Sequence, residues 1–290
     1  MAAVAGSYIR ITYVDDVSAS HDLDFRQPLF GYETTILLSV DMARNDTGRL
    51  SVFDSGGGTQ TLDIRQCACT ILMDATEMAA FNAAFKDDST KGRARNVVIS
   101  MYAGGSGFRP FGPDQSDKGP FTVTMEVLEE PAAMARPYKC FAVKLLLTNV
   151  GAYPAFIPPT ATEGAASPVT IGSVTGVRYP AGWFAAKLST AQAALSTPGA
   201  TAYWRDRGPG ADRYETSATF KLSIGKAAAV INQLVSTTRA ASFTLAVPAG
   251  SLPFGASKSS PHTVMLAQDA IKMTHDRWNE INMPLTFALV

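Results

Sequence analysis

Apolar and polar residues alternate over short runs along most of the chain, and Gly, Pro, Asn or Asp bounds many of the runs. Such period-two patterns predict strands with one buried face. The expected strands are 9–14, 34–40, 49–53, 64–73, 96–102, 121–128 and 140–147 in the first half, and 216–224, 242–247, 263–266 and 283–287 in the second. Between them, the polar run 15–24 predicts a loop. The chain is therefore expected to be mostly β.

Two segments change to the period of a helix. Met78, Phe81 and Phe85 are spaced i, i+3, i+7 and form one apolar face. Asp74 followed by Glu77 has the pattern of an N-terminal capping box. The second expected helix lies at about 227–235, with an apolar face of Val230, Ile231 and Leu234. We therefore expect an α+β protein with one short helix in each half.

The two halves repeat the same order: a turn, a strand, a helix, a strand, a Pro-Phe-Gly loop and two more strands. The motif at 110–112 matches the one at 253–255. The offset between matched residues falls from 151 before the helix, where Cys67 matches Ala218, to 140 in the last strand. A steady fall predicts shorter loops in the second copy, since loops tolerate changes in length.

The repeat predicts two tandem domains, at 1–150 and 174–290. Between them, residues 151–173 are rich in Pro, Ala, Gly, Ser and Thr and are expected to form a linker or arm. The alternatives are one large irregular α+β domain or two unrelated domains. At 290 residues the chain is long enough for two hydrophobic cores.

The low charged fraction is typical of a protein that assembles, although a high content of Ala and Gly could produce the same figure. Charged residues make up 17% of the chain, below the roughly 25% of ordinary soluble domains, as in chains that cover part of their surface with other subunits. The 25 basic and 25 acidic residues leave no excess to attract nucleic acid or an anionic membrane. No signal peptide and no apolar run of about 20 residues is recognised. We expect a protein made in a reducing cytosol.

Residues with metal-binding or nucleophilic chemistry are few. Cys67 and Cys69 share one face of a predicted strand, and Cys140 begins another strand that could lie nearby. Three thiolates with a fourth ligand could bind a metal ion, but a buried free cysteine also packs as a small apolar residue. The second half carries Ala218 and Phe220 where the first has Cys67 and Cys69, which favours packing.

The remaining candidates indicate no active site. His21, His262 and His275 lack the spacing of metal ligands and are expected at the surface. Residues 55–58, Ser-Gly-Gly-Gly, predict a hairpin turn, not a phosphate loop. Asp114 and Asp117 lie in a loop without the glutamate of a calcium site. We therefore predict no catalytic, cofactor-binding or metal-binding residue, and a protein that is not an enzyme.

The run from Arg49 through Phe85, the strand 96–102, the segment 108–113 and the strands 121–128 and 141–147 resemble tail proteins of long-tailed bacteriophages. The likeness is closest to the distal tail, tail tube and baseplate hub group. It implies β-sandwich or barrel-like domains, each with a helix at its side. It also implies that sheets of neighbouring subunits join into a ring around the DNA channel.

The same resemblance gives the repeat a meaning, because hub proteins of that group carry two such domains and their trimers imitate hexamers. It implies a trimer with pseudo-sixfold symmetry or a hexamer, located in the virion tail. The expected partners are the tail tube, the tail tip proteins, a tape-measure protein and DNA passing through the lumen, with no membrane.

Three alternatives stay open. The ring could belong to the tail tube or the tail terminator. The chain could be a binding module that presents Tyr102, Phe108 and Phe111 to a carbohydrate or receptor, although packing of these rings is favoured. It could also be an enzyme with an unrecognised site.

Overall fold

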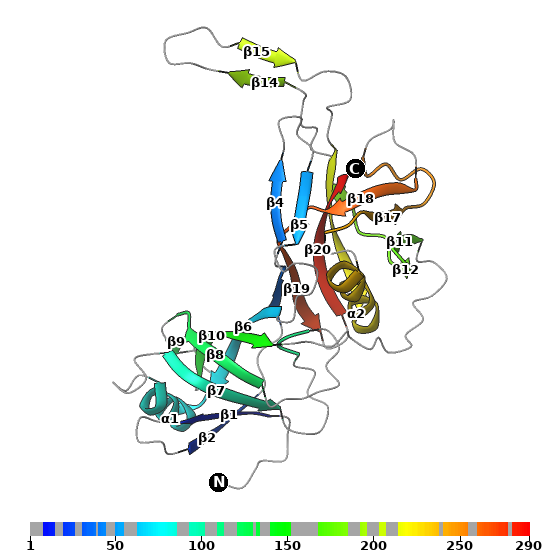
Figure 1. Ribbon diagram of the computed structural model, residues 1–290. Helices are drawn as coiled ribbons and strands as arrows, with labels where there is room; N and C mark the ends of the chain where they lie inside the picture. Colours follow the sequence, from blue (N-terminus) through cyan, green and yellow to red (C-terminus); the bar gives the residue numbers. More distant parts are fainter. Residues whose placement is uncertain are drawn as a thin grey trace. The chain divides into compact units, whose positions relative to one another are not determined.

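The structure is a computed structural model, and the residues that it describes are mostly β, with antiparallel sheets and a helix in each half (Figure 1). It describes residues 8–14, 20–26, 31–38, 40–44, 50–54, 63–85, 93–101, 109–112, 121–129, 132–133, 140–151, 168–184, 192–195, 203–206, 214–237, 240–254, 260–277 and 280–290. The expectation of a mostly β, α+β protein is confirmed.

The first half contributes β1 (Tyr8–Val14), β2 (Ser20–Arg26), β3 (Tyr32–Leu37), β4 (Val40–Arg44), β5 (Leu50–Asp54), β6 (Asp63–Met73), α1 (Ala75–Phe85), β7 (Arg93–Met101), β8 (Phe121–Val127), β9 (Ala132–Ala133) and β10 (Phe141–Gly151). The strand β2 begins at Ser20, so the expected loop 15–24 is wrong in its last part. The strand β1 offers the edge with which β2 pairs, and Arg10, Ile11 and Thr12 lie opposite residues of β2. This pairing overrides the polar composition of β2.

The second half contributes β11 (Val169–Ile171), β12 (Val174–Val177), β13 (Trp183–Phe184), β14 (Gln192–Leu195), β15 (Tyr203–Asp206), β16 (Glu215–Ser223), α2 (Ile224–Ile231), a π-helical turn (Asn232–Thr237), β17 (Phe243–Ala246), β18 (His262–Leu266), β19 (Ala270–Arg277) and β20 (Glu280–Leu289). The strand β11 lies inside the range 151–173 that was expected to be a linker.

The pairing of strands is the same in both halves of the described chain. In the first half the pairs are β1–β2, β1–β7, β7–β8, β8–β10, β9–β10, β6–β10, β3–β6 and β4–β5. In the second half they are β11–β12, β11–β17, β17–β18, β18–β20, β19–β20, β16–β20, β13–β16 and β14–β15. Each strand of the second half therefore pairs like the strand ten places earlier.

Contacts group the chain into two compact units, and neither unit is a single stretch. Unit 1 comprises residues up to 37, 61–157 and 272–281, and unit 2 comprises 38–60, 158–271 and 282–290. The hairpin β4–β5 of the first half therefore belongs to unit 2, and most of β19 belongs to unit 1. The sequence prediction, by contrast, placed two continuous domains at 1–150 and 174–290.

The core of unit 1 lies inside a curved sheet. The strand β2 contacts β6 although the two are far apart in the pairing order, so the sheet bends around buried side chains. Met78 and Phe81 of α1 fill this core beside Ile11, Met125 and Leu147. The side chain of Phe85, which was expected on the same helical face, lies outside the described residues.

The capping box of α1 is confirmed. The Asp74 Oδ1 atom accepts hydrogen bonds of 2.8 Å from the main-chain N–H groups of Thr76 and Glu77. The Glu77 carboxylate in turn accepts a 2.8 Å bond from the Asp74 N–H group. Three of the N–H groups around the start of the helix are thereby satisfied without water.

Unit 2 is organised by aromatic rings in edge-to-face contact. Trp183 contacts Phe220, Phe220 contacts Phe287, and Phe287 contacts Phe243, with centroid separations of 5.9, 6.3 and 6.1 Å. The helix α2 covers this core beside β16 and β12 (Figure 1). It begins after Ser223, whose hydroxyl caps the Lys226 N–H group.

The two helix caps correct the alignment of the repeat. Asp74 and Ser223 occupy the same place, directly after the matching strands β6 and β16, and they are 149 residues apart. Cys69 therefore corresponds to Ala218, and the match of Cys67 with Ala218 was wrong by two residues. A shift of two preserves the alternation of faces, so the apolar pattern alone does not reveal it.

The repeated Pro-Phe-Gly loops place a phenylalanine in the same position of each half. Phe111 and Phe254 are both 0% exposed. Phe111 packs edge-on against Phe121, at the start of β8, with centroids 5.3 Å apart. Phe254 packs similarly against His262, at the start of β18, at 5.0 Å. Each loop therefore closes its core with one ring.

Truncating either ring is expected to destabilise the protein strongly. Phe111→Ala and Phe254→Ala should each lower the free energy of unfolding by roughly 3–5 kcal/mol, because each leaves a cavity in a packed core. Phe53→Ala, at a side chain that is 58% exposed, is the matched control and should change it little. Denaturant melts of the three variants measure this, and a neutral effect at only one of the two buried positions contradicts the equivalence of the loops.

Candidate functional site

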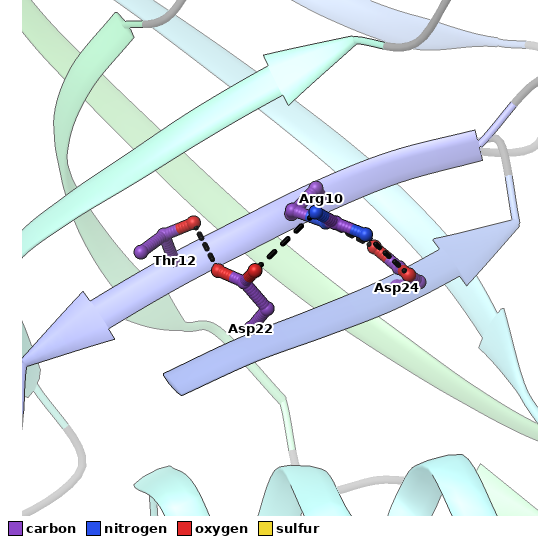
Figure 2. Close-up of polar contacts among 4 residues, drawn as sticks. All are labelled: Arg10, Thr12, Asp22 and Asp24. Atoms are coloured by element: carbon purple, nitrogen blue, oxygen red, sulfur yellow. Dashed lines mark hydrogen bonds and ion pairs between the residues drawn. The ribbon is translucent and has the colours of Figure 1, made fainter. Parts of the chain in front are cut away.

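A network of charged residues joins the paired strands β1 and β2 (Figure 2). The Arg10 guanidinium donates to both oxygens of Asp24, at 2.8 and 3.0 Å, and lies 3.3 Å from the Asp22 carboxylate. The Thr12 hydroxyl donates to the other Asp22 oxygen at 2.6 Å. Arg10 is directly opposite Asp24 and Thr12 directly opposite Asp22. We call these four residues the edge ladder.

The edge ladder is suited to guarding a sheet edge. The strand β2 is the last strand at one end of the main pairing order. Its acidic side chains are partly exposed, at 48% for Asp22 and 34% for Asp24, so the pairs add little stability. Charged side chains on an edge strand disfavour pairing with another chain. The arrangement therefore matches the register of β1 with β2 and disfavours the pairing of a further strand with β2.

A second polar cluster is buried where β3 meets β19. The rings of Tyr32 and His275 stack with centroids 4.2 Å apart and planes 13° apart. The Thr34 hydroxyl lies 3.2 Å from the His275 Nε2 atom and 3.0 Å from the Pro110 carbonyl oxygen. The Gly31 N–H group donates to the His275 carbonyl at 2.8 Å. We call Tyr32, Thr34 and His275 the junction cluster.

The hydrogen bonds of the junction cluster fix its protonation. A hydroxyl carries one hydrogen, and the carbonyl of Pro110 can only accept it. The Thr34 oxygen must then accept a hydrogen from Nε2 of His275, which selects the neutral tautomer protonated at that nitrogen. Burial, with the nearby Arg109 charge, lowers the pKa of His275 to about 3. Burial likewise raises the pKa of Tyr32.

The junction cluster has the residue types of a hydrolase but not the access. Cys67 lies opposite Thr34, so a thiol, a hydroxyl and an imidazole are gathered at this point. Thr34 and Cys67 are 0% exposed, however, and His275 is 3% exposed. A substrate cannot reach them without opening the core, and burial raises the pKa of the Cys67 thiol so that it stays protonated. The cluster is therefore suited to holding strands together.

The cysteines do not gather. Cys67 and Cys69 are buried in the core of unit 1, and the described structure has no disulfide at Cys67, Cys69 or Cys140. Cys140 directly precedes Phe141, which pairs with Met73 at the far end of β6, four residues or roughly 13 Å along the strand from Cys69. Among the described residues, no three His, Cys, Asp or Glu side chains lie together so as to hold a metal ion.

The expectation that the histidines lie at the surface is wrong for His262 and His275. Each is 3% exposed. The signal for burial is the alternation Ile271, Met273, His275, which places the imidazole on the apolar face of its strand. Burial lowers the pKa of His262 as well. The side chain of His21 lies outside the described residues.

One surface pocket of about 300 Å³ lies in unit 1, lined in part by Glu33, Thr70, Glu129 and Lys144. The Lys144 ammonium pairs with the Glu129 carboxylate, and both side chains are at least half exposed. A solvated pair of this kind neutralises its own charge. The pocket offers neither a buried charged group nor an activated nucleophile.

Several predicted candidates lie outside the described residues: the glycine-rich run 55–58, Asp114, Asp117, Tyr102 and Phe108. The third ring proposed for ligand binding, Phe111, is fully buried and serves the core instead. Among the described helices, none is long and apolar enough to cross a membrane.

No protein-family model and no curated protein matches this chain. A function is therefore inferred from the geometry of the chain itself. That geometry consists of two buried cores, a repeated pairing scheme and a polar junction shielded from solvent.

The junction cluster is expected to make stability depend on pH. His275 binds a proton in the unfolded chain below about pH 6.5 but stays neutral in the folded one, so stability is complete above that pH and falls on acidification. The loss should reach about 1.4 kcal/mol per pH unit for this one proton. Denaturant melts between about pH 6.5 and 5 should show a shallower slope in His275→Gln than in the wild type, and an unchanged slope contradicts the argument.

Proposed function

We propose that this chain is a structural component of a long-tailed phage virion, forming a ring at the tail tip or baseplate that surrounds the DNA channel. The observation that carries the proposal is the repeated pairing scheme. Eight strand pairs of the first half have counterparts in the second, together with the helix cap and the buried Pro-Phe-Gly ring. Two tandem tail-tube-like domains, products of a duplication, account for this repetition.

A duplicated scaffold supports ring assembly. One chain with two similar units presents two similar sets of surfaces, so that a ring of a few chains contains twice as many units. Head-to-tail contacts between unlike surfaces give such rings when the rotation from one subunit to the next closes. A trimer with pseudo-sixfold symmetry, or a hexamer with two layers of units, follows from this arrangement.

The differences between the halves also support a structural role. The buried phenylalanine of the Pro-Phe-Gly loop packs against Phe121 in the first half and against His262 in the second. The capping residues are Asp74 and Ser223, and Cys69 matches Ala218. The repetition preserves backbone pairing and core volume, while the chemical groups at matching positions change. Selection for a scaffold produces this pattern, whereas selection for a shared active site preserves particular side chains.

Exposed apolar side chains add a surface that assembly would cover. Ile64 and Val150 stand directly opposite each other on β6 and β10 and are 37% and 57% exposed. Leu128, which follows β8, is 46% exposed. The tail tube and the tail tip proteins are the proposed neighbours, with a tape-measure protein and DNA inside the lumen.

Purified protein is expected to form closed rings, visible in negative-stain images and measured as a discrete oligomer by light scattering. Immunogold labelling of phage particles should place the chain at the tail tip. Labelling along the whole tube, or at the head end of the tail, would identify a tube or terminator ring instead. If the purified protein is a monodisperse monomer and is absent from phage tails, the proposal is contradicted.

A further inference from the structure

The pairing of β3 with β19 has no counterpart within the described chain, although the strands themselves do. In the first half β3 lies between β6 and β19. Its matching strand in the second half, β13, pairs with β16, and no strand of the described residues occupies its other edge. The strand that matches β19 is β9, which pairs with β10 and likewise has an unoccupied edge among the described residues.

From this we infer that copies of the chain join by pairing the outer edge of β13 with the outer edge of β9 of the next copy. The inference rests on the ring proposed above and names the contact that forms it. In this contact, β13 of one copy and β9 of the next pair in the way that β3 and β19 pair within one chain.

The existing β3–β19 contact shows what such a contact contains. Main-chain hydrogen bonds of 2.8 Å run from Gly31 to His275 and from Leu38 to Asp269. The stacked Tyr32 and His275 rings bury its side chains. Tyr32 also accepts a 3.0 Å bond from the Arg109 N–H group at its hydroxyl. The pairing is therefore satisfied in both backbone and side-chain hydrogen bonds.

At the matching place on β13, the polar group is not satisfied. Trp183 lies opposite Ala218, which matches Cys69, and Tyr32 stands beside Cys69. Trp183 therefore occupies the place of Tyr32. Its indole N–H is shielded from solvent and has no hydrogen-bond partner among the described residues. A buried donor left unpaired costs roughly 1–3 kcal/mol.

The other ends of the sheet are built differently. The strand β2 carries the edge ladder of charged side chains, which disfavours a new partner (Figure 2). The strands β9 and β13 are Ala132–Ala133 and Trp183–Phe184, with no charge on either. Their edges are unlike each other, so the contact is head-to-tail, and it gives a ring when the rotation from one copy to the next closes. A second copy of this chain is the partner that fits both edges.

Photo-crosslinking tests the contact. A p-benzoyl-phenylalanine at Phe184 keeps an aromatic side chain and adds a photoreactive benzoyl group. A mixture of unlabelled and heavy-isotope-labelled chains distinguishes crosslinks between copies from those within one. We expect crosslinks from residue 184 of one copy to the segment around Ala132 and Ala133 of another. The matched control places the same group at Phe53, an exposed ring on β5, and should give no product with that segment.

Proline variants test it from the other side. Ala132→Pro and Ala133→Pro each remove one N–H group from β9, and the group that points away from β10 is the one needed by the next copy. At least one of them should raise the concentration for half-assembly about tenfold or more without lowering the melting temperature of the isolated chain.

The outcomes separate the two proposals. Rings whose crosslinks from residue 184 map elsewhere overturn the β13–β9 contact and leave the ring intact. Chains that form no oligomer in solution or on tails overturn both. If neither proline variant weakens assembly while both fold normally, the β9 edge is not the contact.

Discussion

Antiparallel backbone pairing is the constraint on which this molecule depends. A strand buried on one face must satisfy its N–H and C=O groups through its neighbours, because water is absent on the core side. In each half the last strand pairs with three other strands and so satisfies part of their hydrogen bonding. These are β6, β8 and β9 for β10, and β16, β18 and β19 for β20. The side chains of Val143, Leu145 and Leu147 on β10 are at most 1% exposed. The core of unit 1 is thus arranged around a strand whose pairing with β6 runs along its whole length.

Once the pairing is fixed, side chains at matching positions can change widely. His262 takes the place of Phe121 beside a buried phenylalanine, and it stays compatible with the core because burial keeps the imidazole neutral. Trp183 takes the place of Tyr32 in the same way. What matters at these positions is ring volume and the absence of charge, since interiors are close-packed and poorly solvating. That freedom explains how the two halves can have the same strand pairs with few identical residues.

The sequence predicted the long strands and both helices because their signals are local. An alternating run such as 64–73 or the capping pair Asp74 and Glu77 needs no distant partner to be recognised. The strands β9, β11 and β13 have two or three residues each, and only the neighbour that pairs with them defines them. The buried histidines were missed because residue type was given more weight than position within the alternation Ile271, Met273, His275.

The β3–β19 contact within the chain differs from the matching edge of β13, and the difference bears on the proposed assembly. Within the chain, His275 of β19 forms a hydrogen bond with Thr34 of β3 and stacks on Tyr32 of the same strand. The folded chain itself therefore supplies every member of the cluster. At the matching edge of β13, Trp183 holds a donor that the described chain does not satisfy. In the ring proposed above, this edge of β13 would meet the next copy, so the contact within the chain would be matched by one between chains.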